Sequence, residues 1–130
     1  SKYKGTLRGL HFQKSPKEEA KLVRCIKGSL FDVIVDLRYK SPTYKQWYGD
    51  TLTSKNKKMM YVPEGFGHAI LTLEDNTEII YFVSEYYSPE HEQGLHWNDK
   101  EIGIEWPIRP RVVSEKDENN PKFDSLIHTV

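Results

Sequence analysis

Short runs rich in strand-forming residues recur along the chain, and none repeats its apolar residues at helical spacing over a useful length. The runs cover residues 21–26, 30–37, 46–53, 59–62, 68–73, 79–84 and 102–106. Many short strands at near-regular spacing, with almost no helix, predict an all-β protein. Its sheets are expected to close into a sandwich or barrel, because closure protects the strand edges.

Two pairs of runs are expected to form hairpins, because the residues between them have turn composition. Lys27-Gly28-Ser29 separates run 21–26 from run 30–37, and residues 74–77 separate run 68–73 from run 79–84. Period-2 alternation also assigns the faces of run 30–37. One face carries Phe31, Val33, Val35 and Leu37, and the opposite face carries Asp32 and Asp36.

Two sites look like helix starts, with a serine at the N-cap position followed by a proline: Ser15-Pro16 and Ser88-Pro89. Neither is followed by an apolar helical repeat, so both are expected to be single turns in loops. Residues 109–130 include Pro110 and Pro121, and this tail is expected to be an ordered loop or short turn over the sheets.

Composition limits the class of protein further. The 130 residues suffice for one domain with a core, and 19 Lys and Arg balance 19 Asp and Glu, which argues against general nucleic-acid binding. Cys25 is the only cysteine, which fits a reducing compartment or a buried thiol. No apolar run approaches the ~20 residues of a membrane span, and the N-terminus lacks a signal-peptide core. We therefore expect a cytoplasmic protein without a membrane partner.

Residues 8–13 carry more polar chemistry than a strand needs. If this segment is extended, His11 shares a face with Gln13, and Arg8 lies on the opposite face with Leu10, unless Gly9 forms a bulge. The structural interpretation of these residues is a surface arginine and a hydrogen-bonded histidine.

Two further positions also combine a possible functional role with a purely structural explanation. His68 follows a Pro-Gly turn, and a buried imidazole bonded to a backbone carbonyl would explain it. Tyr81 lies between Ile79 and Val83 on one strand face, and a core tyrosine with its hydroxyl at the rim would explain it.

The turn before His68 also raises the question of a metal, since metal-binding cupins use a Pro-x-Gly-x-x-His turn. Their other motif supplies two closely spaced histidines and a glutamate, whereas this chain offers His11 alone, with Glu18 or Glu19 as the carboxylate. A triad of His11, Glu18 and His68 would suit iron and an oxygenase. Because such a site has only two imidazoles, it depends on a glutamate whose loop position the sequence does not determine, and we expect no metal.

An ordered series of motifs runs through the chain, including Arg8-Gly9-Leu10-His11 and Pro63-Glu64-Gly65-Phe66-Gly67-His68. The full series covers residues 5–13, 21–24, 31–38, 41–43, 63–68, 86–92, 97–99, 106–107 and 114–117. It resembles the dTDP-4-dehydrorhamnose 3,5-epimerase family, which acts on nucleotide-linked 4-keto-6-deoxyhexoses. The resemblance implies a cupin-type double-stranded β-helix, or jelly-roll barrel, without a cofactor or catalytic metal. It also implies a nucleotide-sugar substrate, a homodimer, and a place in dTDP-rhamnose or O-antigen biosynthesis.

The resemblance implies four catalytic residues. His11 would be the general base, oriented by Asp117, Tyr81 would be the general acid across the sugar ring, and Lys21 would face the C4 oxygen. The reaction independently requires a base, an acid and a group that stabilises negative charge, because inversion beside a ketone removes a proton, leaves an enolate and returns a proton to the opposite face. Lys21 can serve only if the strand face that it shares with Val23 points into the barrel.

Four more residues are implied to bind the substrate: Arg8, His68, Glu92 and Lys116. Arg8 offers a planar pair of donors to a pyrophosphate, and Lys116 would lie near the nucleotide. Family members usually carry further strands before the segment that contains Arg8, and here those strands are expected to be absent. The alternatives are an epimerase of a GDP-linked keto-heptose, an epimerase of a single carbon, an inactive sugar-nucleotide-binding cupin, and the iron oxygenase.

Overall fold

The structure is a computed structural model that describes residues 1–130, and it consists mainly of strands. In chain order the strands are β1 (Thr6–Gln13), β2 (Lys21–Lys27), β3 (Ser29–Asp36), β4 (Trp47–Thr53), β5 (Met59–Val62), β6 (Phe66–Thr72), β7 (Glu78–Val83), β8 (Glu92–Gly94) and β9 (Val112–Val113). Two single-turn helices follow, α1 (Glu115–Glu118) and α2 (Ser125–His128). The all-β prediction is therefore confirmed. Neither helix has the length and apolar character of a membrane-spanning segment.

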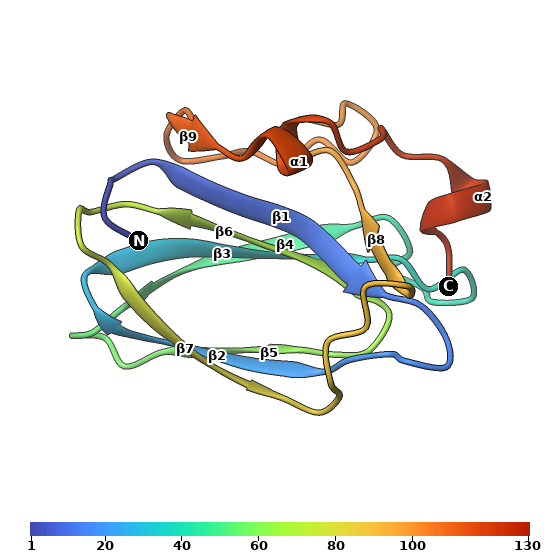
Figure 1. Ribbon diagram of the computed structural model, residues 1–130, viewed down its shortest axis with the longest axis horizontal. Coiled ribbons are helices and arrows are strands. Elements are labelled where there is room, and N and C mark those ends of the chain that lie inside the picture. Colours follow the sequence, from blue (N-terminus) through green and yellow to red (C-terminus); the bar gives the residue numbers. More distant parts are fainter.

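The strands form two sheets that face each other (Figure 1). The larger, six-stranded sheet has the order β4-β3-β6-β1-β8, with β9 pairing parallel to β1, and the smaller sheet has the order β5-β2-β7. The remaining strand pairs are antiparallel. This double-sheet arrangement is the one expected of a jelly roll.

Both predicted hairpins are wrong. Strand β2 pairs with β5 and β7, whereas β3 pairs with β4 and β6, so the turn at Gly28 carries the chain from one sheet to the other. The same holds for β6 and β7. Gly28 has a φ of +82°, and an added Cβ would lie 2.6 Å from the hydroxyl of Thr77. The turn residues thus form a tight corner between the two sheets. They were mistaken for hairpin turns because a local chain reversal does not determine with which strand each flanking strand pairs.

The inner core fills the space between the two sheets and has eight members: Val23, Cys25, Leu30, Ile34, Leu52, Met60, Val62 and Ile70. Strand β3 contributes to it with the same face that carries Asp32, so this strand is buried on both sides. The predicted faces of β3 are confirmed, and the polar residues lie on the face toward the smaller sheet. Cys25 is a buried free thiol, and burial raises its pKa.

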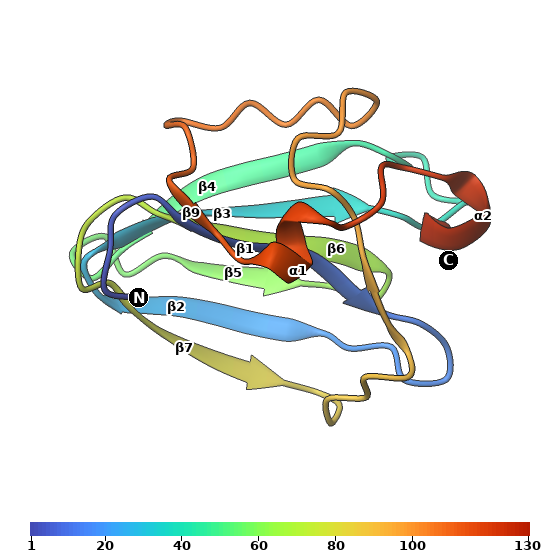
Figure 2. The same cartoon turned by 45° about the horizontal axis from the view of Figure 1, so that its top comes forward.

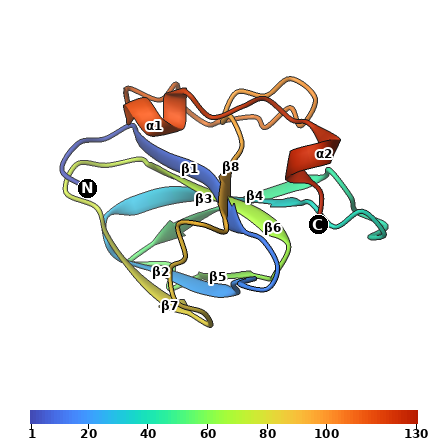
Figure 3. The same ribbon diagram turned by 45° about the vertical axis from the view of Figure 1, so that its right-hand side comes forward.

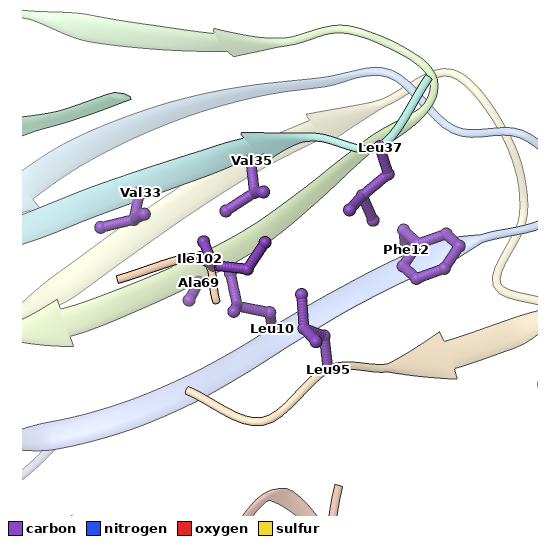
Figure 4. Packing of buried hydrophobic residues seen from close by; sticks show 8 residues of the cluster. All are labelled: Leu10, Phe12, Val33, Val35, Leu37, Ala69, Leu95 and Ile102. Atoms are coloured by element: carbon purple, nitrogen blue, oxygen red, sulfur yellow. The ribbon is translucent and has the colours of Figure 1, made fainter. Parts of the chain in front are cut away.

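The outer face of the larger sheet is covered by the C-terminal segment (Figure 2). Leu95 and Ile102 from this segment pack on side chains of β1, β3 and β6, as Figure 4 shows. The strand expected over residues 102–106 is absent, and these residues instead cover the sheet in an irregular conformation. The tail is ordered as predicted, but it includes two helical turns and the short strand β9. The two Ser-Pro sites form turns, as expected.

Candidate active site

A pocket of about 270 Å³ opens between the two sheets. Its lining combines polar side chains with two apolar ones, and the residues are Arg8, His11, Glu19, Lys21, His68, Ile70, Tyr81 and Val83. Five of the residues named from the sequence therefore lie around a single pocket. They come from β1, β2, β6 and β7, and so from both sheets.

A bulge at Gly9 brings Arg8 and His11 onto the same face of β1. Arg8 pairs with Ile70 and His11 pairs with His68, so β1 has one residue more than β6 between the two pairs. Gly9 has a φ of +125°, and an added Cβ would lie 2.6 Å from the backbone oxygen of His68. The bulge therefore requires glycine, and it overrides the simple alternation that separates Arg8 from His11.

His11 is held by Asp117. Nε2 of His11 lies 2.6 Å from Oδ1 of Asp117, while Oδ2 of Asp117 accepts a hydrogen bond from the backbone N–H of Gly9 at 3.2 Å. Ser114 caps helix α1 by accepting from the backbone N–H of Asp117 at 3.1 Å, which fixes the start of this turn. Asp117 is only 4% exposed, so it can act on the imidazole ring with little screening by water.

The smaller sheet supplies Lys21 and Tyr81. Lys21 pairs with Val83 and Val23 pairs with Tyr81, so the inward face of β2 continues into that of β7. This confirms that Lys21 shares the barrel-facing side with Val23. Burial of the hydroxyl is the largest reason why the pKa of Tyr81 is raised, and nearby Asp32 raises it further, against an opposing effect of Arg8. The phenol is therefore protonated at neutral pH and can donate a proton.

His68 does not bond to a backbone carbonyl. Its Nε2 lies 2.6 Å from Oδ1 of Asp32, a carboxylate with no exposed surface, and its Nδ1 lies 3.5 Å from Nζ of Lys21. Nζ of Lys21 also lies 3.6 Å from Oε1 of Glu19. The ring of Tyr81 stands edge-on to that of His68, with centroids 6.4 Å apart.

A second, smaller pocket of about 150 Å³ adjoins the first and shares His11, Glu19 and Lys21 with it. Glu92 lies on its wall, with Oε1 4.0 Å from Nε2 of His11 and 3.0 Å from Nζ of Lys116. Burial alone would raise the pKa of Glu92, but hydrogen bonds from Tyr87 and Lys116 and the nearby His11 lower it below its usual value. Glu92 is therefore ionised at neutral pH.

The link from β7 to β8 brings Tyr87, and Glu92 at the start of β8, to this second pocket. Figure 3 shows it rising from the smaller sheet to the larger one across the end of the sandwich. Its backbone is tied to β1, because Gln13 donates to the carbonyl oxygen of Tyr86 at 3.3 Å and accepts from the N–H of Ser88 at 2.8 Å.

The sequence analysis missed three residues of the site, namely Asp32, Glu19 as a neighbour of Lys21, and Tyr87. Asp32 had a readable signal, since it interrupts the apolar inner face of β3 between Leu30 and Ile34. Glu19 and Tyr87 lie in loops, where no periodicity predicts which way a side chain points.

The alternative of an iron triad made of His11, Glu18 and His68 is not supported. No group of three His, Cys, Asp or Glu side chains is placed to hold a metal ion, and Nε2 of each pocket histidine faces an aspartate. The arrangement can instead carry out acid–base chemistry. An imidazole backed by a carboxylate comes from the larger sheet, and a protonated phenol and an ammonium group come from the smaller one.

Comparison with known proteins agrees with the resemblance seen in the sequence motifs. The sequence model of the family described as dTDP-4-dehydrorhamnose 3,5-epimerase matches residues 1–125. The dTDP-4-dehydrorhamnose 3,5-epimerase of Shigella flexneri is 47% identical over 120 residues, which cover 92% of this chain and 66% of that protein. The chain thus spans about two thirds of the length of this relative.

Solved structures agree in fold. The crystal structure of dTDP-4-dehydrorhamnose 3,5-epimerase from Bacillus anthracis with TDP and PPi bound superposes with a TM-score of 0.92 at 48% identity, over 95% of this chain and 70% of that one. The 3'-monoepimerase ChmJ from Streptomyces bikiniensis, in complex with dTDP-quinovose, superposes with a TM-score of 0.86 at 35% identity, over 93% of this chain and 62% of that one. The cupin-type double-sheet fold is confirmed.

Proposed function

The chain belongs to the dTDP-4-dehydrorhamnose 3,5-epimerase family, and from this we propose that it inverts C3, C5 or both of a nucleoside-diphosphate 4-keto-6-deoxyhexose. The observation that carries the proposal is that His11 and Tyr81 line one pocket from opposite sheets, together with Lys21. Inversion requires a base and an acid on the two sides of a ring, and the origin of these two side chains in facing sheets supports the proposal.

In the proposed reaction, His11 removes the proton from the carbon beside the C4 ketone. Since Nε2 of His11 bonds to Asp117, the free lone pair is on Nδ1, and the carboxylate stabilises the imidazolium that forms. The electrons of the C–H bond move into a C=C bond, and the C4 oxygen becomes negative. The ammonium group of Lys21 stabilises this oxygen, and Tyr81 returns a proton from the opposite face. The step is balanced by proton transfer alone, so it requires no redox cofactor.

The remaining polar residues are proposed to bind the nucleotide sugar. Arg8 lies on the pocket face beside His11 and can offer two parallel donors to the diphosphate. His68 lies in the same pocket, whereas Glu92 and Lys116 form an ion pair at the neighbouring one. That pair can bind a sugar hydroxyl or a nucleotide group near the mouth.

We propose that residues 1–130 act as one cytoplasmic domain within a homodimer. The outer face of the smaller sheet supports the dimer, because its exposed side chains are mostly apolar: Ile26, Met59, Tyr61, Ile80 and Phe82. Strand β7 is an edge strand with Glu78 as its only charged residue, although edge strands that face water usually carry several charges. A second copy of the chain would cover this face, and sedimentation at increasing protein concentration tests it.

A single-carbon epimerase is the second candidate, favoured by the superposition on ChmJ, which is named as a 3'-monoepimerase. Deuterium from D₂O is expected to enter a dTDP-linked 4-keto-6-deoxyhexose at C3 and C5 if both carbons are inverted, and at one carbon if only one is inverted. Proton NMR of the sugar distinguishes the two. Binding without any exchange would instead identify an inactive sugar-nucleotide-binding module.

A further inference from the structure

Asp32 is the most deeply buried charged group at the pocket, and its hydrogen bonding is confined to one partner. It has no exposed surface, Oδ1 bonds to Nε2 of His68 at 2.6 Å, and Oδ2 is buried without a hydrogen-bond partner. A carboxylate in such a place costs free energy that an apolar residue of similar size would not. Its contacts therefore indicate a role that is exerted through His68.

The other nitrogen of His68 faces an ammonium group. Nζ of Lys21 lies 3.5 Å from Nδ1, and an ammonium has three donors and no acceptor. Nδ1 must then present its lone pair, which leaves the ring proton on Nε2, where it is donated to Asp32. The ammonium group also pairs with Glu19, whose Oε1 lies 3.6 Å from Nζ.

We propose that Asp32, acting through His68, sets the position of the Lys21 ammonium group, and that His68 does so as a neutral ring with its proton on Nε2. In this arrangement His68 is a positioning residue rather than a proton donor to the substrate. The proposal rests on the proposed function, since it concerns where the group that stabilises the enolate is held. It also explains why an acidic residue occupies the inner face of β3.

Imidazole nitrogen NMR tests the tautomer without any substrate. Two-bond proton–nitrogen correlations on ¹⁵N-histidine-labelled protein distinguish a ring protonated on Nε2 from one protonated on Nδ1 and from an imidazolium. The signals of His68 are those that disappear in His68→Asn. We expect the Nε2-protonated pattern in the resting protein. Either of the other two patterns would overturn the proposal.

Asparagine at position 32 removes the charge and, by donating its NH₂ group to Nε2, can shift the ring proton to Nδ1, against the ammonium group. We expect Asp32→Asn to lower the deuterium-exchange rate at saturating substrate by about 10–100-fold, the range seen when partners that orient metal-bound histidines are lost, with KM changed by less than about 2-fold. The control is Asp36→Asn. It also removes a buried carboxylate from β3, but Asp36 bonds to Arg38, Ser41 and Thr43 away from the pocket.

A double-mutant cycle separates positioning from a general loss of structure. If Asp32 acts through Lys21, adding Asp32→Asn to Lys21→Ala changes the remaining exchange rate by less than about 2-fold. An equal fall in both backgrounds would show that Asp32 acts in another way, and the proposal would be wrong. If the unchanged protein itself exchanges no deuterium, the proposed function fails, and the NMR measurement still decides the tautomer.

Discussion

Oδ1 of Asp117 lies 2.6 Å from Nε2 of His11, although 106 positions of the chain separate the two residues. The single helical turn that carries Asp117 lies beside β1, the strand that carries His11. Asp117 is thus placed to hold one ring tautomer and to stabilise the imidazolium during proton transfer.

Replacing Asp117 by asparagine should leave the fold intact and weaken the base. We expect Asp117→Asn to lower the rate of deuterium exchange by about 10²-fold or more, because the charge that stabilises the imidazolium is lost. The deuterium-exchange rate at saturating substrate, compared with that of the wild type, measures this loss. Glu118→Gln is the matched control, since Glu118 lies on the same turn but faces Trp97 and His96. Wild-type exchange in Asp117→Asn would contradict the assignment.

His11→Ala removes the proposed general base. We expect it to abolish exchange at C3 and at C5, because both nitrogens of His68, the other imidazole of the pocket, already face side chains, Nε2 at 2.6 Å from Asp32 and Nδ1 at 3.5 Å from Lys21. His96→Ala is a control, since His96 stacks on Trp97 away from the pocket. Proton NMR of the sugar after incubation in D₂O is the measurement, and full exchange in His11→Ala would mean that another residue is the base.

Tyr81→Phe should separate the two halves of the reaction. In the proposed mechanism the phenol returns the proton from the opposite face, so we expect inversion to fall more than exchange does, by about 10²-fold for inversion. Exchange and the yield of inverted sugar are measured on the same samples. Tyr61→Phe is the control, because Tyr61 lies on the exposed outer face of the same sheet. Equal losses of exchange and inversion would argue against an acid role.

Gly9→Ala tests the bulge that brings Arg8 and His11 together. A side chain there meets both a φ of +125° and a backbone oxygen at 2.6 Å. Gly103→Ala is the matched control, since its φ is +70° but its nearest neighbour is 3.7 Å away. We expect Gly103→Ala to lower the free energy of unfolding by about 1–2 kcal/mol and Gly9→Ala to lower it by more. Urea denaturation gives both values, and equal losses would mean that the close approach has no cost.

Asp36 should make the free energy of unfolding depend on pH in the acidic range. Burial alone would raise the pKa of this carboxyl, but hydrogen bonds from Arg38, Ser41 and Thr43 hold it well below its usual range. A lowered folded-state pKa gives stability that is present above the unfolded-state pKa, near 4, and is lost as the pH falls toward the folded-state value. Asp36→Asn should therefore lower the free energy of unfolding by about 1–3 kcal/mol at pH 7, with a smaller difference from wild type at pH 3. A difference that stays constant between these pH values would refute this.

Much of the site could be anticipated from the sequence, but not its internal bonding. His11, Lys21, Tyr81 and Arg8 were named as site residues and line one pocket. The sequence led us to expect that His68 bonds to a backbone carbonyl, whereas in the structure it pairs with Asp32. That pair is formed by strands that lie side by side only in the folded sheet, so no local pattern contains it.

What the sequence determined by itself is the position of most of the strands and, where a strand is regular, which side chains share a face, since a strand's period of two is a property of the local backbone. The alternation in residues 30–37 was sufficient for this. Only the tertiary structure decided which sheet each strand joins, as the two corners mistaken for hairpins demonstrate. It also decided that the Gly9 bulge turns Arg8 toward His11 and that Asp117 reaches the same ring. These outcomes depend on contacts between distant segments, because strand partners are selected by long-range burial and backbone fit rather than by neighbouring residues.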